Sequence, residues 1–141
     1  MILGFEDLFT AIQSDTIALC LEYLENSNVF ADKIFVFFYQ SSHERMFNAF
    51  FKIGDKVKTV GEIAGEYESE EFLDVGDEDL EKLIEACKKY EHSCPNEFKL
   101  VYDVNTESFD ADYGYEAYSE TSDKSPAEVF EEWIIQIKNE V

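Results

Sequence analysis

Residues 33–39 read Lys-Ile-Phe-Val-Phe-Phe-Tyr, and this stretch decides how the rest of the chain is interpreted. β-Branched and aromatic side chains predominate in it, which is typical of a β-strand. The apolar residues follow one another without alternating with polar ones, so the strand has no face that clearly contacts water. The stretch therefore predicts a central strand of a sheet.

The segments on either side of this strand supply a helix and two further strands. Residues 5–25 place apolar side chains at roughly helical spacing with acidic residues mostly between them, which predicts an amphipathic helix. Residues 46–53 form a second, aromatic strand, and Gly54-Asp55 separates it from a third strand at 56–60. The three strands are expected to form an antiparallel meander.

The second half of the chain predicts a loop, a helix, a hairpin and a final helix. Residues 61–76 lack steady periodicity and are expected to form a long surface loop that can include a short helix. Asp77 is expected to cap the helix that follows. Residues 98–104 and 109–116 alternate as the two strands of a hairpin, and Ser125-Pro-Ala-Glu is a capping box that begins the last helix.

This order of elements indicates an α+β fold with an antiparallel sheet of about five strands, made of the three-strand meander and the hairpin. The helices are expected to pack on one face of the sheet. With 141 residues, of which 45% are hydrophobic, the chain is long and apolar enough for a real core. We therefore expect a single domain over residues 1–141.

The charge of the chain is strongly acidic and unevenly distributed. Aspartate and glutamate number 32 against 11 lysines and arginines, a net charge of −21, of which residues 62–120 contribute −15. Self-repulsion of this size opposes compactness, so such a surface is expected to serve solubility or to attract a basic partner. It also argues against binding to nucleic acid or to an anionic membrane, because both would be repelled.

The hairpin holds the clearest cluster of carboxylates. Alternation along residues 109–116 places Asp110, Asp112 and Glu116 on one face of the strand, and Asp103 of the neighbouring strand can join them. Stacked carboxylates can hold a divalent cation, or they can present a negative stripe to a basic partner. An ordinary solvated sheet face has the same composition, so all three interpretations stay open.

The sequence shows no motif for catalysis or for a cofactor. It contains no glycine-rich phosphate loop, no Gly-x-Ser-x-Gly elbow and no His/Cys set with zinc spacing. Cys20, Cys87 and Cys94 lack Cys-x-x-Cys spacing and are expected to be buried or incidental thiols. We therefore expect no catalytic residues, no metal and no cofactor.

The start of the chain, Met-Ile-Leu-Gly-Phe-Glu-Asp, has no basic region and no small-residue cleavage site. No apolar run approaches the roughly 18 residues that a membrane span needs. These features predict a cytoplasmic protein.

In three places the chain resembles the YezG-like family of bacterial immunity proteins, antitoxins to polymorphic toxins with an LXG-type delivery region. The resemblance lies in the strand Asn48-Ala-Phe-Phe-Lys-Ile, in the hairpin Leu100-Val-Tyr-Asp-Val-Asn-Thr with Phe109-Asp-Ala-Asp-Tyr, and in the closing Lys124-Ser-Pro with Val129-Phe-Glu-Glu-Trp. The resemblance implies a small protein that binds and blocks a cognate toxin, often a nuclease, and has no activity of its own. None of these motifs is catalytic.

Charge and resemblance together lead to one hypothesis, an immunity protein that occludes a basic toxin domain, expected to be a nuclease. An acidic adaptor, or a DNA mimic that competes for nucleic-acid-binding proteins, is the alternative, and a carboxylate-metal enzyme is a third. The oligomeric state is not predicted. The residues expected to bind the partner are Glu66, Tyr67, Glu68, Glu70, Glu71, Asp74, Asp77, Asp79, Asp110, Asp112 and Glu116.

Overall fold

The computed structural model describes residues 4–140; residues 1–3, which belong to the start predicted to lack a leader, and residue 141 lie outside the described residues. The elements follow in the order α1 (Phe5–Asn26), β1 (Lys33–Gln40), β2 (Arg45–Ile53), β3 (Lys56–Thr59), α2 (Val60–Ile63), α3 (Glu66–Lys89), β4 (Glu97–Asp103), β5 (Ser108–Gly114), α4 (Tyr118–Thr121) and α5 (Pro126–Glu140).

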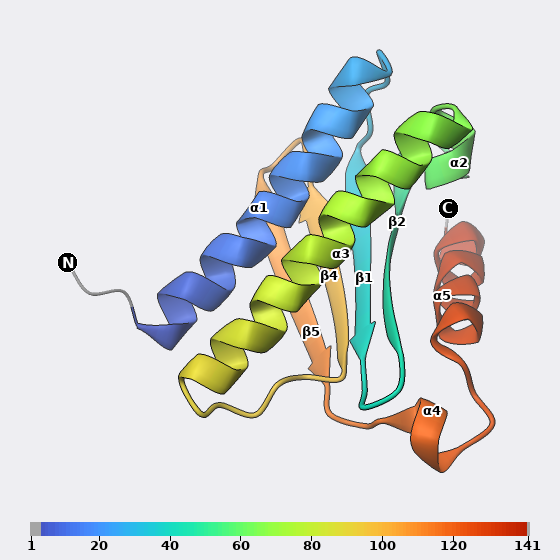
Figure 1. Ribbon diagram of the computed structural model, residues 1–141. Coiled ribbons are helices and arrows are strands. Elements are labelled where there is room, and N and C mark those ends of the chain that lie inside the picture. The colour runs from blue at the N-terminus through green and yellow to red at the C-terminus, as the bar shows by residue number, and fades with distance from the viewer. Residues whose placement is uncertain (1–3, 141) are drawn as a thin grey trace.

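The five strands form one antiparallel sheet with β1 at its centre. The strand order is β3-β2-β1-β4-β5, so the meander β1-β2-β3 and the hairpin β4-β5 meet where β1 pairs with β4 (Figure 1). Every residue from Ile34 to Tyr39 is buried, as expected of a strand that has a neighbour on each side and a packed layer on each face. The α+β class, the five antiparallel strands and the central position of residues 33–39 are confirmed.

Helices cover both faces of this sheet, which corrects the expectation that they pack on one face. Because successive side chains of a strand point to opposite faces, Val36 and Phe38 pack in the core beneath α1 and α3, while Phe35 and Phe37 point the other way. There α5 packs on them, with the ring of Trp133 5.6 Å from that of Phe35. Figure 1 shows α1 and α3 side by side and α5 apart from them.

The stretch 61–76 is mostly helical, which corrects the prediction of a long loop. After the single turn of α2, α3 begins at Glu66, so the acidic stretch forms the first half of a 24-residue helix and Asp77 lies inside it and does not cap it. Three buried positions of α3 carry Ser69, Gly76 and Asp79, none of which is a large apolar residue. A search for hydrophobic periodicity therefore misses this part of the buried stripe.

Each of these three residues is explained by a neighbour. The Ser69 hydroxyl lies 3.0 Å from that of Tyr23 on α1. A Cβ atom at Gly76 would lie 2.0 Å from the ring of Phe47, so the absence of a side chain lets α3 approach β2 closely. Asp79 is hydrogen-bonded to α1, as described below. Tertiary contacts thus hold a segment whose local sequence does not predict a helix.

Candidate protein-binding surface

The exposed charged side chains of α1 and of the first two-thirds of α3 are all acidic, although Arg45 of β2 lines a hollow together with Asp77, Glu78 and Glu81. Residues 5–26 and 66–81 contain no lysine or arginine, and the first basic residue of α3 is Lys82. Thirteen exposed carboxylates lie on these two segments, five on α1 and eight on α3. They belong to Glu6, Asp7, Asp15, Glu22, Glu25, Glu66, Glu68, Glu70, Glu71, Asp74, Asp77, Glu78 and Glu81.

The structure thus brings six predicted acids of α3 together, beside Tyr67, whose side chain is 75% exposed. It adds the five acids of α1, which sequence reasoning left out because that helix was read only for its apolar stripe. The absence of any base from residues 5–26 was the signal that could have found them.

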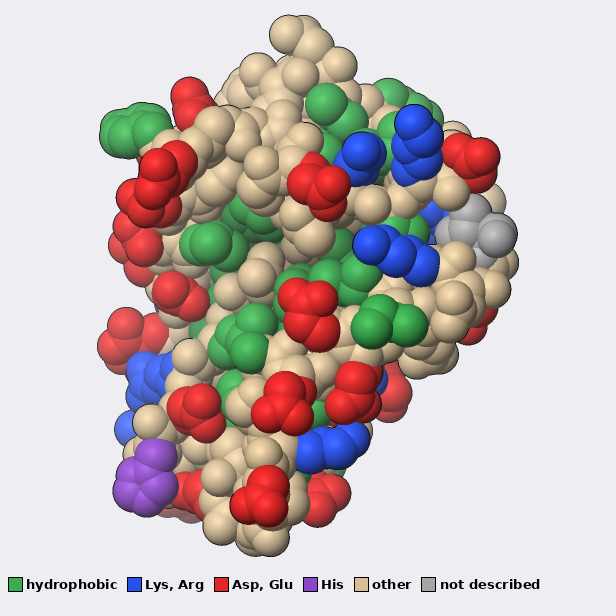
Figure 2. All heavy atoms as spheres, turned by 90° about the vertical axis from the view of Figure 1, so that its right-hand side faces the viewer, with side chains coloured by type: hydrophobic (Ala, Val, Ile, Leu, Met, Phe, Trp, Pro, Cys, Tyr) green, Lys and Arg blue, Asp and Glu red, His purple; other side chains and the backbone are tan. Residues whose placement is uncertain are grey.

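The side of the molecule that carries α5 has a different electrostatic character. Figure 2 shows lysines and carboxylates interspersed there. Several of these charges pair with one another: Lys124 Nζ lies 3.3 Å from Glu132 Oε2, and Lys58 Nζ lies 4.0 Å from Glu62 Oε2. The charge of the protein is therefore unevenly distributed, and the α1 and α3 side is predominantly negative, with Arg45 and Lys82 as basic residues at the edge of its acidic part.

A groove of about 340 Å³ runs between α1 and α3 within this acidic surface. Apolar side chains and carboxylates both line it. Within the described part of the chain, the carboxylates of Glu22, Glu68 and Glu71 have no hydrogen-bond or ion-pair partner. The lining residues are Leu19, Glu22, Tyr23, Asn26, Ser27, Glu68, Glu71, Phe72 and Val75.

Asp79 is not part of the accessible surface, although the sequence placed it among the partner-binding residues. It is only 5% exposed, and its Oδ2 accepts a hydrogen bond of 2.9 Å from Thr16 Oγ1 on α1. Burial disfavours the charged carboxylate and raises the pKa of Asp79, an effect that the Thr16 hydroxyl and nearby Lys82 partly offset. Asp79 therefore joins the two helices instead of contacting a partner.

Asp77 stays exposed, but its environment also disfavours its charge. Partial burial, and after it the Asp74 carboxylate, raise the pKa of Asp77. Arg45 of β2 lines the same hollow as Asp77, so this end of the acidic surface includes a basic residue.

The acids of the hairpin lie away from those of α3, and only Asp110 and Asp112 of the predicted Asp110, Asp112 and Glu116 stripe line the same groove. Asp112 pairs in register with Lys99, and both border a groove of about 250 Å³ next to Trp133 of α5. Asp110 lines the same groove, whereas Glu116 lies beyond the end of β5 at Gly114. Asp110 and Asp112 are therefore on the face of the sheet opposite α1 and α3, and a basic residue stands among them.

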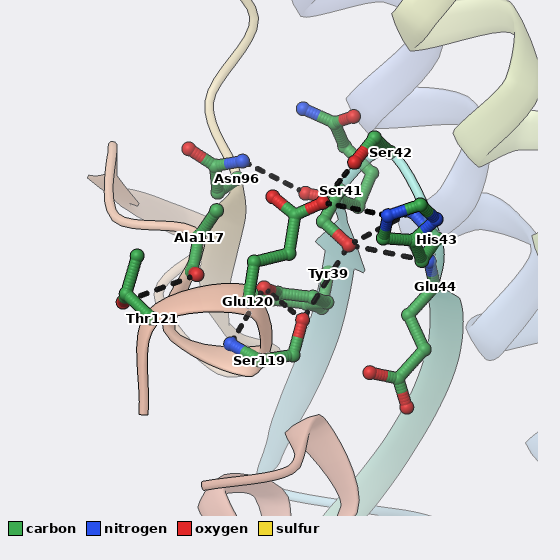
Figure 3. Close-up of polar contacts among 11 residues, drawn as sticks. Tyr39, Ser41, Ser42, His43, Glu44, Asn96, Ala117, Ser119, Glu120 and Thr121 are labelled. Carbon is green, nitrogen blue, oxygen red and sulfur yellow. Dashed lines mark hydrogen bonds and ion pairs between the residues drawn. The ribbon is translucent and has the colours of Figure 1, made fainter. Parts of the chain in front are cut away.

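The turn between β1 and β2 brings Ser42 and His43 next to Glu120 of α4 (Figure 3). Ser42 Oγ donates a hydrogen bond to Glu120 Oε1, and His43 Nε2 lies 3.8 Å from the same oxygen. In a catalytic triad the histidine stands between the nucleophile and the carboxylate, whereas here the carboxylate stands between the other two. Together with the 2.7 Å hydrogen bond between the hydroxyls of Tyr39 and Ser119, the cluster fastens α4 to the sheet.

Residues 4–140 hold no group of three or more histidine, cysteine, aspartate or glutamate side chains arranged to bind a metal ion. In the same range no helix has both the length and the apolar character needed to cross a bilayer. No protein-family model matches the sequence, and no curated protein matches it significantly. Function is therefore inferred from the charge and shape of the surface.

Proposed function

We propose that this protein is an immunity protein that binds and neutralises a cognate basic toxin domain, with a nuclease as the expected type, and has no catalytic activity itself. The observation that supports the proposal is the predominantly acidic surface of α1 and α3, where residues 5–26 and 66–81 carry thirteen exposed carboxylates and no base. A nuclease needs a cationic cleft for its polyanionic substrate, and an acidic surface can cover that cleft.

Electrostatic steering gives this surface a physical role in association. Complementary charges raise the association rate of two proteins by orders of magnitude and reject partners of like charge. Fast capture matters for an antitoxin, because an uninhibited toxin acts from the moment that it enters the cell. The resemblance of the strand, the hairpin and the last helix to the YezG-like family supports the same proposal. The proposed mechanism is occlusion.

The test compares two triple charge reversals that change the net charge equally. Glu66, Glu70 and Asp74 follow one another at four-residue intervals on α3, and all three are exposed. Replacing each by lysine should lower the association rate with the toxin domain about tenfold at low salt and flatten its salt dependence. The partner is to be sought as the variable C-terminal domain of a large secreted protein, by inspecting the genes that adjoin this one.

The matched control reverses Asp110, Asp112 and Glu116, which lie outside the α1 and α3 surface. It should leave the association rate close to that of the wild type. Equal slowing by both triple variants would mean that total charge matters and that the location of the carboxylates does not, which would contradict docking through α1 and α3.

Selectivity separates this function from that of a general DNA mimic. An immunity protein should protect cells against one toxin and bind unrelated DNA-binding proteins poorly, because specificity requires contacts that reject other partners. Inhibition of several unrelated DNA-binding proteins at similar concentrations would favour the mimic instead.

A further inference from the structure

The groove between α1 and α3 is built from two facing rows of side chains. Leu19 and Tyr23 of α1, four residues apart, face Phe72 and Val75 of α3, three residues apart, so each helix contributes one row to an apolar floor. The Tyr23 and Phe72 rings are in contact, with 4.5 Å between their centroids, and close the bottom. Unpaired carboxylates border this floor on both sides.

The acids at this end of α1 do nothing for the helix itself. Glu22 and Glu25 lie near the C-terminal end of α1, where the helix dipole is negative, and the last turn contains no basic residue. Carboxylates are disfavoured there and cations are favoured. A cation bound in the groove would therefore compensate Glu22, Glu68, Glu71 and the end of α1 at once.

We propose that this groove binds an arginine side chain of the partner; this inference rests on the proposed function and names the contact through which the acidic surface recognises its partner. A guanidinium has five donors in a planar fork and can serve carboxylates on both helices, whereas an ammonium is a compact point charge. The aliphatic stem of arginine matches the apolar floor, including Val75, which is 37% exposed. A second copy of this chain is a poor occupant, because it would bring a net charge of −21 against the same carboxylates.

The experiment titrates the full-length, isotope-labelled protein with acetyl-Gly-Arg-Gly-amide and follows backbone amide signals by NMR. Shifts should concentrate on the groove residues Leu19, Phe72 and Val75. The peptide with lysine in place of arginine should bind several-fold more weakly, and the peptide with citrulline, which is neutral and nearly isosteric, should not bind. Shifts spread evenly over all acidic segments, or equal binding of the arginine and citrulline peptides, would overturn the proposal.

Two single variants on the same helix provide a matched comparison. Glu71→Gln removes a carboxylate from the groove, and Glu70→Gln removes its exposed neighbour, which does not line the groove. Glu71→Gln should weaken the arginine peptide about threefold, as expected for the loss of one partly exposed ion pair. Glu70→Gln should leave the affinity within experimental error, and equal weakening by both variants would show only diffuse attraction.

The outcome is separable from that of the proposed function. If the arginine peptide binds the groove but the protein protects against no toxin, the groove stands and the immunity function fails. If a toxin is neutralised and the Glu66, Glu70 and Asp74 reversals slow its capture, but the peptide and Glu71→Gln show no effect, the immunity function stands and the arginine site is wrong.

Discussion

Replacing Gly76 by alanine tests whether the position of α3 depends on close approach to β2. The new Cβ atom would lie 2.0 Å from Cε2 and 2.1 Å from Cδ2 of Phe47, whereas ordinary van der Waals contact begins at 3.4 Å. The helix or the ring must therefore move by more than an ångström. The ring is confined, since Phe47 is only 5% exposed and its centroid lies 5.3 Å from that of Phe38 and 5.4 Å from that of Phe72.

Two opposing terms set the size of the effect. Overpacking a well-filled core costs about 1–3 kcal/mol. Alanine in place of glycine inside a helix recovers about 1 kcal/mol of helix propensity. Because the overlap is deep and the ring is held on two sides, we expect the overpacking cost at its upper end and a net decrease of about 2 kcal/mol in the free energy of unfolding.

Urea denaturation followed by the fluorescence of Trp133 measures this change. Trp133 is the only tryptophan and lies in the core on the other face of the sheet, so its signal reports unfolding of the whole sheet. The midpoint should fall without a change in slope, and the melting temperature should drop by about 6 °C. Gly61→Ala is the matched control: no atom lies within 4 Å of its added Cβ, and it should be neutral or stabilise by about 0.5 kcal/mol.

If Gly76→Ala raised the free energy of unfolding as Gly61→Ala is expected to do, the reasoning would be refuted, because the Phe47 ring would then not need the space. A double-mutant comparison with Phe47→Leu tests whether the loss of stability comes from contact with the Phe47 ring. In a Phe47→Leu background the smaller side chain leaves room, so the cost of Gly76→Ala should shrink, and unchanged costs in both backgrounds would show that the two positions are not coupled.

Three further predictions concern polar groups that are buried or half-buried. Because the pKa of Asp79 is raised above its ordinary value of 3.8, the native protein loses stability as the pH rises from 3.8 through the folded-state pKa. Asp79→Asn can still accept the Thr16 hydrogen bond, and in urea denaturation it should be more stable than the wild type at pH 7, by a margin that shrinks toward pH 3.8. A margin that does not change with pH would show that burial of the Asp79 charge does not matter. Tyr39→Phe removes the hydroxyl that is hydrogen-bonded to Ser119 and should lower the free energy of unfolding by about 1 kcal/mol. An unchanged free energy of unfolding would show that other contacts hold α4 in place. Partial burial raises the pKa of the half-buried Cys94 thiol to about 12, so a disulfide reagent at pH 8 should modify it more slowly in the native protein than in urea. Equal rates would show that the fold does not shield this thiol.

Several elements could be predicted because local chemistry determines them. The run from Ile34 to Tyr39 is apolar at every position, and only a strand covered on both faces accommodates such a run. Ser125 begins α5 as its sequence predicts, since its hydroxyl accepts a hydrogen bond of 3.1 Å from the Glu128 amide. The same apolar run already implied that packed layers cover both faces of the sheet, so the prediction that the helices pack on one face did not follow from it.

The candidate site could be predicted only in part. That the acids of residues 66–77 would be exposed followed from their number and spacing, although the segment was expected to be a loop. Asp79 could not be recognised as buried, because its environment depends on Thr16, 63 residues earlier in the chain. The five acids of α1 share a surface with those of α3 only because the two helices pack side by side.

The sequence by itself determined the charge of this protein, the central strand, the meander, the hairpin and the start of the last helix, because each depends on side chains that are neighbours along the chain. Only the tertiary structure decided that the stretch from Glu66 is helical, since Ser69, Gly76 and Asp79 become suitable helix positions once Tyr23, Phe47 and Thr16 lie opposite them. It also decided which carboxylates act together. Strand pairing places Asp110 and Asp112 on the far face of the sheet, and helix packing places α1 beside α3.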